Sequence, residues 1–212
     1  MLLSYDMYHM ITKEEVVNIL IVFAHPQRQS LNGSLLDQTI KSLNEGEIKP
    51  DIQVVDLYRE SFDPRLQFGS DKKRRDMHKD PEMENYRQMV LWAKKIIFIY
   101  PIWWGRPPAI LLGFFDRLMA SEFAYRHSKK DLLATGLLRG REVVCLSTMK
   151  APGWFAELWL GGAHKILMRR AVFHFVGIHK VKFLQLAEME DPSGRKQNRA
   201  LDKVGRYFRK AG

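Results

Sequence analysis

One apolar run that ends abruptly in a turn constrains the fold of this chain more than any other feature. Residues 96–99 read Ile-Ile-Phe-Ile and have no polar face, as expected for a parallel strand covered on both sides. Pro101 withholds an N–H from a sheet ladder, Gly105 permits unusual dihedral angles, and Pro107 or Pro108 suits the first turn of a helix. The segment therefore predicts a central strand, a stiff outward-facing turn and then an amphipathic helix.

Apolar runs and helical spacings alternate along the rest of the chain. Strands are expected at residues 16–24, 52–57, 95–100, 142–147 and 181–186. Helices are expected at residues 30–43, 83–93 and 191–210, after the turn that ends at Pro108, and within residues 154–175, with Asp191 or Ser193 capping the last one. This alternation predicts a doubly wound α/β fold, with five parallel strands in the order 2-1-3-4-5 and helices on both faces. Residues 16–212 should form this single domain, preceded by a loose extension over residues 1–15.

Composition restricts the class of protein. Of 212 residues, 46% are hydrophobic, which is enough for a full core. Cys145 is the sole cysteine, so neither a disulfide nor a metal site is expected. We find no secretory signal and no apolar run long enough to span a bilayer, which predicts a cytoplasmic protein.

The charge is strongly basic. A net charge of +10 favours an anionic partner, and the basic residues gather in residues 72–75 and 195–210. Such charges usually form a solvated face, and no nucleic-acid-binding motif accompanies them, so no specific nucleic-acid function is expected. A peripheral contact with a membrane protein stays open.

Three loops are expected to meet where the strand order reverses, which is where doubly wound sheets bind ligands. They are residues 25–32, 101–105 and 147–153. The first is rich in hydrogen-bonding side chains and opens a helix, so its N–H groups and the helix dipole suit a phosphate. It lacks G-x-G-x-x-G and a Walker lysine, which disfavours a nucleoside triphosphate or a Rossmann-type dinucleotide.

Trp103 and Trp104 stand side by side in the second loop, where polar groups are more usual. A flat aromatic ligand against them is one explanation, and a plug over a hydrophobic edge is the other. Likewise, Ser30 and Asn32 are expected to bind phosphate, to cap the helix, or to do both. A polar phosphate loop beside an aromatic platform indicates a flavin.

Several short motifs then occur together in one order. They are Ala24-His25-Pro26, Ser30-Leu31-Asn32, Tyr100-Pro101-Ile102-Trp103-Trp104-Gly105, Pro108-Ala109-Ile110-Leu111, Phe115-Asp116-Arg117, Glu122-Phe123-Ala124-Tyr125 and His174-Phe175-Val176-Gly177. Together they resemble the flavodoxin-like NAD(P)H:quinone oxidoreductases, the DT-diaphorase group and its bacterial relatives. The resemblance covers most of residues 16–210. It implies a flavodoxin-like fold and a bound flavin, with FMN preferred and FAD as the alternative.

The resemblance also implies which residues hold the cofactor. The phosphates are expected on the first loop, and the ring on the turn and on the loop after residues 142–147. The cofactor-binding residues are then His25, Gln29, Ser30, Leu31, Asn32, Pro101, Ile102, Trp103, Trp104, Gly105, Ser147, Thr148 and Met149. The substrate pocket is expected to contain Trp103, Tyr125, His127, Trp154 and Phe155. In a homodimer with the site at the interface, Tyr125 and His127 would reach the partner's flavin.

One departure leaves the catalytic residue unassigned. Better-known members of the family have a Thr-Gly-Gly-like loop followed by a Tyr and a His that assist hydride transfer, whereas residues 148–155 contain neither. His127 is the candidate proton donor, with a solvated loop histidine as the alternative reading. His164 is expected to be an ordinary helix residue.

The activity implied by the resemblance is flavin-dependent reduction of quinones or similar electrophilic acceptors. NADPH or NADH would give hydride to the flavin, and a quinone would then take the same place in a ping-pong, two-electron scheme. The alternatives are a regulatory flavin-binding subunit of a potassium-efflux-type membrane system and a flavodoxin-like electron carrier. The basic charge disfavours the carrier. The physiological acceptor, NADH versus NADPH, and FMN versus FAD remain open.

Large apolar side chains after the turn predict a homodimer. They exceed what one helix face needs for packing on a sheet, so a second copy is expected to cover the surplus. These side chains are Phe114, Phe115, Leu118, Met119, Phe123 and Tyr125.

Overall fold

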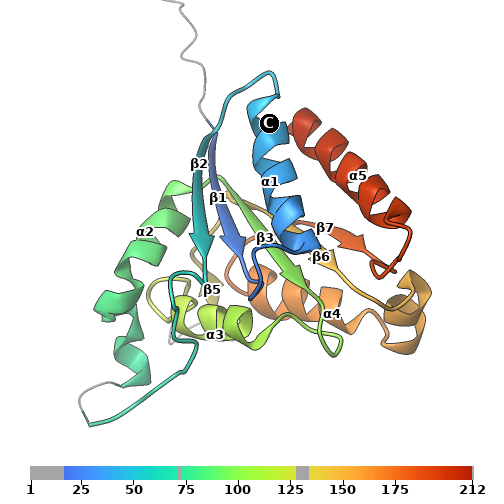
Figure 1. Cartoon of the computed structure of the whole chain (residues 1–212). Coiled ribbons are helices and arrows are strands. Elements are labelled where there is room, and N and C mark those ends of the chain that lie inside the picture. Colours follow the sequence, from blue (N-terminus) through green and yellow to red (C-terminus); the bar gives the residue numbers. More distant parts are fainter. Residues whose placement is uncertain (1–16, 71–72, 128–133, 212) are drawn as a thin grey trace, which may run out of the picture.

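The fold is one parallel sheet between two helical layers, as the computed structural model shows (Figure 1). The structure describes residues 17–70, 73–127 and 134–211, so the extension expected over residues 1–15 lies outside the described residues. The sheet has the order β2-β1-β3-β6-β7. Its strands are β1 (Asn18–Phe23), β2 (Asp51–Asp56), β3 (Lys95–Pro101), β6 (Glu142–Thr148) and β7 (Lys180–Leu186). All neighbouring strands are parallel, which confirms the doubly wound class.

Two short strands lie outside this sheet. β4 (Tyr125–Arg126) and β5 (Thr135–Gly136) pair antiparallel as a separate ribbon. Two-residue strands are too short to give a periodic pattern, so these two were not predicted from the sequence. The strands expected fourth and fifth are therefore β6 and β7.

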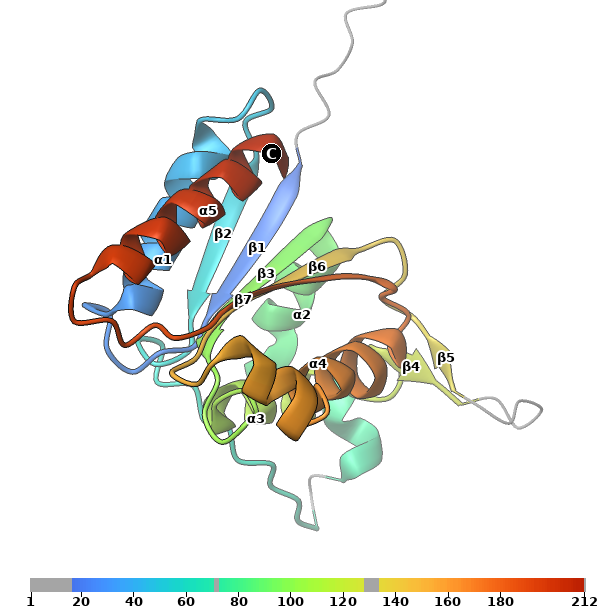
Figure 2. The ribbon, with the colours of Figure 1, turned by 90° about the vertical axis from the view of Figure 1, so that its right-hand side faces the viewer.

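Helices cover both faces of the sheet. α1 (Leu31–Asn44) and α5 (Arg195–Ala211) lie on one face, and α2 (Glu84–Trp92) and α3 (Ala109–Leu118) lie on the other (Figure 2). The helix expected within residues 154–175 is three segments, the π-helical η3 (Phe155–Trp159), α4 (Ala163–Ile166) and the π-helical η4 (Leu167–His174). Two 3₁₀ turns, η1 (Arg74–Lys79) and η2 (Pro81–Met83), precede α2.

The alternation of side chains in β3 explains its lack of a polar face. Ile97 and Ile99 join the core beneath α1 and α5, whereas Ile96, Phe98 and Tyr100 join the core beneath α2 and α3. Both sets are buried, because each face of a parallel sheet in this fold carries helices.

The apolar side chains of α3 belong to the core, so the surface argument for a dimer was wrong. Phe114, Phe115 and Leu118 are at most 4% exposed, and Phe114 packs edge-on against Phe62 of the connection that follows β2. This connection covers a side of α3 that a second copy was expected to cover. Met119, Phe123 and Tyr125 are partly buried and pack against the same core. The large apolar side chains that remain exposed include Trp104, Trp154, Leu158, Trp159, Ile166 and Phe175.

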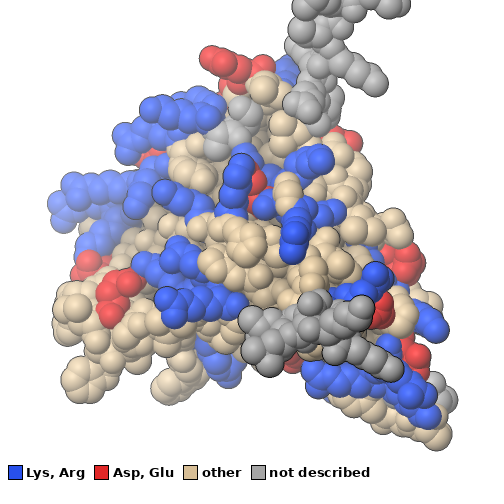
Figure 3. All heavy atoms as spheres, turned by 180° about the vertical axis from the view of Figure 1, so that it is seen from behind, with Lys and Arg blue, Asp and Glu red and all other residues tan. Residues whose placement is uncertain are grey.

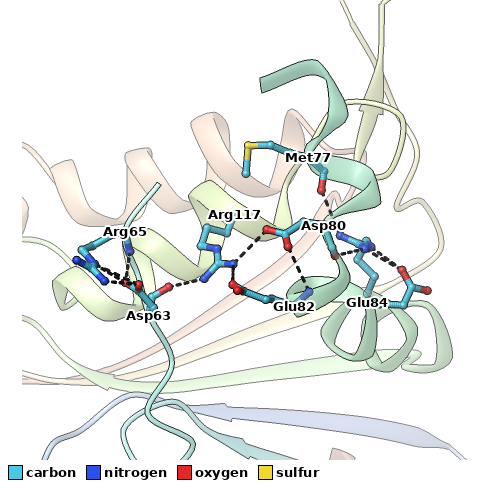
Figure 4. Close-up of polar contacts among 8 residues, drawn as sticks. Asp63, Arg65, Met77, Asp80, Glu82, Glu84 and Arg117 are labelled. Carbon is cyan, nitrogen blue, oxygen red and sulfur yellow. Dashed lines mark hydrogen bonds and ion pairs between the residues drawn. The ribbon is translucent and has the colours of Figure 1, made fainter. Parts of the chain in front are cut away.

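A buried arginine attaches the same connection to α3 (Figure 4). The Arg117 guanidinium donates to the carbonyl oxygen of Asp63 at 2.7 Å, to Asp80 at 3.1 Å and to Glu82, and it lies 5.4 Å from the centre of the Phe62 ring. Burial opposes its charge, but the bonds to Glu82 and Asp80 outweigh burial and raise the pKa of Arg117. The long polar segment before α2 is thereby held in one place.

The rear surface is basic, with Lys and Arg spread widely and few acidic side chains between them (Figure 3). On α5, the exposed Arg199, Lys203, Arg206 and Lys210 follow helical spacing. Among the described residues, no helix is long and apolar enough to cross a bilayer.

Candidate active site

A cavity of about 790 Å³ opens at the carboxyl ends of β1, β3 and β6, within the range typical of small-molecule sites. It brings together most of the residues expected around a cofactor. They are His25, Ser30, Leu31, Asn32, Pro101, Ile102, Trp103, Trp104, Gly105, Thr148 and Met149, joined by Phe155. The cavity therefore lies at the carboxyl ends of the strands where the reversal of strand order predicted a ligand site.

Five of the expected residues do not line this cavity. Gln29 is exposed, Ser147 is fully buried within β6, and Trp154 is 62% exposed. Tyr125 and His127 lie apart from it, where Tyr125 contacts His127 and Phe175 with ring centres 5.5 and 4.9 Å apart. A role for these last two in a site requires that they act on another copy of the chain.

The first loop closes tightly over the start of α1. Ser30 is the N-cap, since its hydroxyl accepts from the N–H of Gly33 at 3.3 Å and also contacts His25 Nδ1 at 3.2 Å. A side chain at Gly33 would lie 1.8 Å from the carbonyl oxygen of Arg28, so the loop can fold back only over glycine. α1 has no acidic residue in its first turn, which leaves the positive end of its dipole uncompensated at the cavity.

Asn32 connects the first loop with the end of β6. Its amide donates to the Thr148 hydroxyl at 2.9 Å, and both residues are buried. The Asn32 Oδ1 atom is buried without a hydrogen-bond partner in the described structure. Buried polar atoms in folded proteins are normally paired, so this oxygen is an acceptor that a ligand donor would satisfy.

The tryptophan turn has an unusual backbone. Trp104 has φ of 52° and Gly105 has φ of 71°, while Trp103 and Arg106 exchange two backbone hydrogen bonds. A positive φ is rare for a bulky residue, and Trp104 is nevertheless 96% exposed. The strained backbone of Trp104 is thus not offset by burial of its side chain. Such strain indicates a surface shaped for a ligand or a partner.

The loop after β6 adds aromatic groups and paired charges. Phe155 stacks on Trp159 with an angle of 15° between the rings. Lys150 pairs with Glu190 at 2.5 Å, and Lys165 pairs with Glu157. Because these lysines have partners, the cavity wall on this side is largely neutral.

The sequence did not predict that His164, on α4, lies in the wall of the cavity. It is 5% exposed and meets the Tyr100 hydroxyl at 2.8 Å through Nε2. Burial lowers the pKa of His164 to about 4, so its imidazole is neutral at physiological pH. The one available sequence signal was Tyr100, a polar-tipped side chain ending an otherwise aliphatic strand.

The donor set suits a phosphorylated flat ring such as a flavin. The uncompensated start of α1 suits the phosphate, and the backbone and rings of Pro101 to Gly105 suit the ring system. The unpaired Asn32 oxygen offers an acceptor between them. No cluster of three or more potential metal ligands occurs in the parts of the chain that the structure describes.

Fold and site together define a flavodoxin-like protein: residues 17–208 match the family described as the flavodoxin-like fold, so the chain belongs to that family. Smu.1420 of Streptococcus mutans is 34% identical and has a TM-score of 0.82, over 91% of this chain and 99% of its own. The structure of the NAD(P)H:quinone oxidoreductase of Methanothermobacter marburgensis has a TM-score of 0.78 at 24% identity, over 93% of this chain and 100% of its own, which shows a shared fold.

Two curated relatives have names that specify an activity. The ribosyldihydronicotinamide dehydrogenase-like protein traD of Penicillium crustosum is 32% identical over 160 residues, or 65% of this chain and 58% of that protein. Human ribosyldihydronicotinamide dehydrogenase [quinone] is 29% identical over 183 residues, or 75% of this chain and 76% of that protein. The chain thus spans less than two thirds of the Penicillium relative.

Proposed function

We propose that this protein is a flavin-dependent NAD(P)H oxidoreductase that reduces quinones or similar small electrophilic acceptors. The observation that carries the proposal is the cavity, which joins the start of α1, the tryptophan turn and the end of β6 at the switch point of the sheet. Relatives whose names state NAD(P)H or quinone oxidoreduction support the same reading. They favour an enzyme over a regulatory subunit or an electron carrier.

Different residues of the chain would bind different parts of the cofactor. The start of α1 at Leu31 and Asn32 would hold the phosphate of FMN, or of FAD as the alternative, through its free N–H groups and the positive end of the helix dipole. The turn from Pro101 to Gly105 supports the ring, and Phe155 limits the access of water from the side of η3. When bound, the flavin supplies the redox chemistry, taking hydride from NADH or NADPH and passing two electrons to the acceptor.

A homodimer is part of the proposal, through a different surface from the one first expected. Trp104, Leu158 and Trp159 are each at least 76% exposed, and they stand beside the cavity rather than in the core. Exposed apolar groups of this size usually mark an interaction site. In this proposal the second copy contributes its Tyr125 and His127 to the cavity, with His127 available to donate a proton. The cytoplasm, where NADH and NADPH are plentiful, is the proposed compartment.

A binding measurement tests the cofactor. Purified protein reconstituted with FMN should absorb near 370 and 450 nm, roughly the usual range for oxidised flavin. Asn32→Ala should weaken FMN binding about tenfold, because it removes a buried polar partner, whereas Ser34→Ala at an exposed position should not. Protein that stays colourless with both FMN and FAD overturns the proposal.

Light scattering tests the assembly. Trp159→Asp should convert a dimer to a monomer and reduce quinone turnover, since an unpaired carboxylate in an apolar interface is costly. Leu91→Asp, on the exposed side of α2, is the matched control. Wild-type protein that is monomeric and fully active at assay concentration would refute the shared site.

A further inference from the structure

The buried pair Tyr100 and His164 joins two elements at the wall of the cavity. Tyr100 is fully buried near the end of β3, and its hydroxyl lies 2.8 Å from Nε2 of His164 on α4. The imidazole also packs edge-on against Tyr100 and Phe183, with ring centres 5.7 and 5.8 Å away. These contacts fix the orientation of the histidine ring.

A hydrogen bond donated by the Tyr100 hydroxyl to Nε2 would fix the tautomer of His164. Burial raises the pKa of Tyr100 well above its usual value, so the hydroxyl always carries a proton to donate. The Cys145 thiol, with a pKa raised to about 12 by burial, also contacts this hydroxyl. A neutral imidazole that accepts at Nε2 carries its single proton on Nδ1.

The proton on Nδ1 has no normal partner in the protein. Nδ1 is buried without a hydrogen bond among the described residues. The Gln185 side chain interacts with the ring and favours the charged imidazole, but this contact does not meet normal hydrogen-bond geometry at Nδ1, and the Gln185 amide donates to the sulfur of Met149 at 3.2 Å. A buried donor without an acceptor is destabilising unless something else supplies the acceptor.

We propose that His164 presents a fixed Nδ1–H donor to a ring carbonyl oxygen of the ligand in this cavity, and that Tyr100 is the positioning residue that holds the donor tautomer. His164 lines the same cavity as the tryptophan turn and the Thr148–Met149 end of β6, so a ring lying there presents its edge to this wall. The inference rests on the proposed function, because flavins and quinones both carry such oxygens. A neutral donor polarises a carbonyl at every pH at which the imidazole stays uncharged.

Nuclear magnetic resonance of protein labelled with ¹⁵N-histidine tests the donor without an activity assay. Ligand-free wild-type protein should show His164 protonated on Nδ1, and its signal, identified by its loss in His164→Asn, should shift when FMN or a soluble quinone binds. Tyr100→Phe should mix the two tautomers. A His164 protonated on Nε2, or a signal unmoved by both ligands although they bind, overturns the proposal.

Two substitutions at position 164 distinguish a hydrogen-bond donor from a side chain that only fills space. Asn places its amide near the position of Nδ1 and Gln near that of Nε2, so His164→Asn should retain most affinity while His164→Gln loses about tenfold. An increase in the FMN dissociation constant assigns the carbonyl oxygen to the flavin. An increase in KM for the quinone alone assigns that oxygen to the acceptor. Equal behaviour of Asn and Gln in both measurements refutes the donor role. Failure of wild-type protein to bind either ligand refutes the proposed function instead, while the tautomer in the ligand-free protein is still measured.

Discussion

Replacing Arg117 with methionine should destabilise the fold strongly, because it removes a buried cation from the carboxylates and the carbonyl that it bridges. The Asp80 side chain is 2% exposed and the Arg117 side chain 6%. Removal of one partner from a buried ion pair costs about 3 to 5 kcal/mol. For a chain of this size, such a loss lowers the melting temperature by roughly 6 to 20 °C. Arg117→Met also loses the bond to the Asp63 carbonyl and the contact with Phe62, which places the expectation toward the upper part of this range.

Scanning calorimetry or circular dichroism measures this change, and a double variant locates its source. Asp80→Asn combined with Arg117→Met should be more stable than the sum of the single changes predicts, because both partners of one ion pair are then removed together. Arg65→Met removes an exposed partner of Asp63 and should leave the melting temperature close to that of wild type. If Arg117→Met melts within about 2 °C of wild type, a shift smaller than 1 kcal/mol produces, then the pair is not holding the connection to α3.

Three further outcomes follow from the site. Gly33→Ala should weaken FMN binding more than Ser34→Ala, since its new methyl group would displace the Arg28 carbonyl from the closed loop; equal affinities would contradict this close approach. Trp104→Gly should melt no lower than wild type, because it relieves a positive φ and loses little burial, yet bind ligand less tightly; a lower melting temperature would show that the indole stabilises the free protein. Between pH 6.5 and about 4, His164 becomes protonated in the unfolded chain but stays neutral in the folded one. The free energy of unfolding of the wild-type protein should therefore fall by on the order of 3 kcal/mol as the pH drops through this range. Urea unfolding should show a flatter dependence of stability on pH for His164→Asn.

Most elements of the fold could be predicted from local patterns in the sequence. β3 was recognisable because both faces of a central parallel strand are apolar, and Ser30 because a serine before an amphipathic run caps a helix. The reversal of strand order then located the cavity, since three loops at one edge of a sheet follow from topology alone.

The errors arose where distant segments meet. The Tyr100–His164 bond spans 64 positions, and no spacing rule connects them. The surplus apolar surface of α3 is covered by residues near Phe62, which belong to a polar connection. The two π-helical segments keep an apolar pattern close to that of an α-helix, so the sequence predicted one helix over residues 154–175 where the structure has three segments.

The two edges of the sheet affect how copies of this protein can associate. β2 and β7 are the edge strands, and exposed Lys180 and Lys182 project from β7 while exposed Asp51 begins β2. Two copies of the β7 edge would bring like charges together, which opposes strand addition and the aggregation it causes. The proposed contact between copies uses the helical segments around Trp159 instead of either edge strand. A charge-neutral variant such as Lys182→Val would weaken this protection and favour aggregation on heating without touching the cavity.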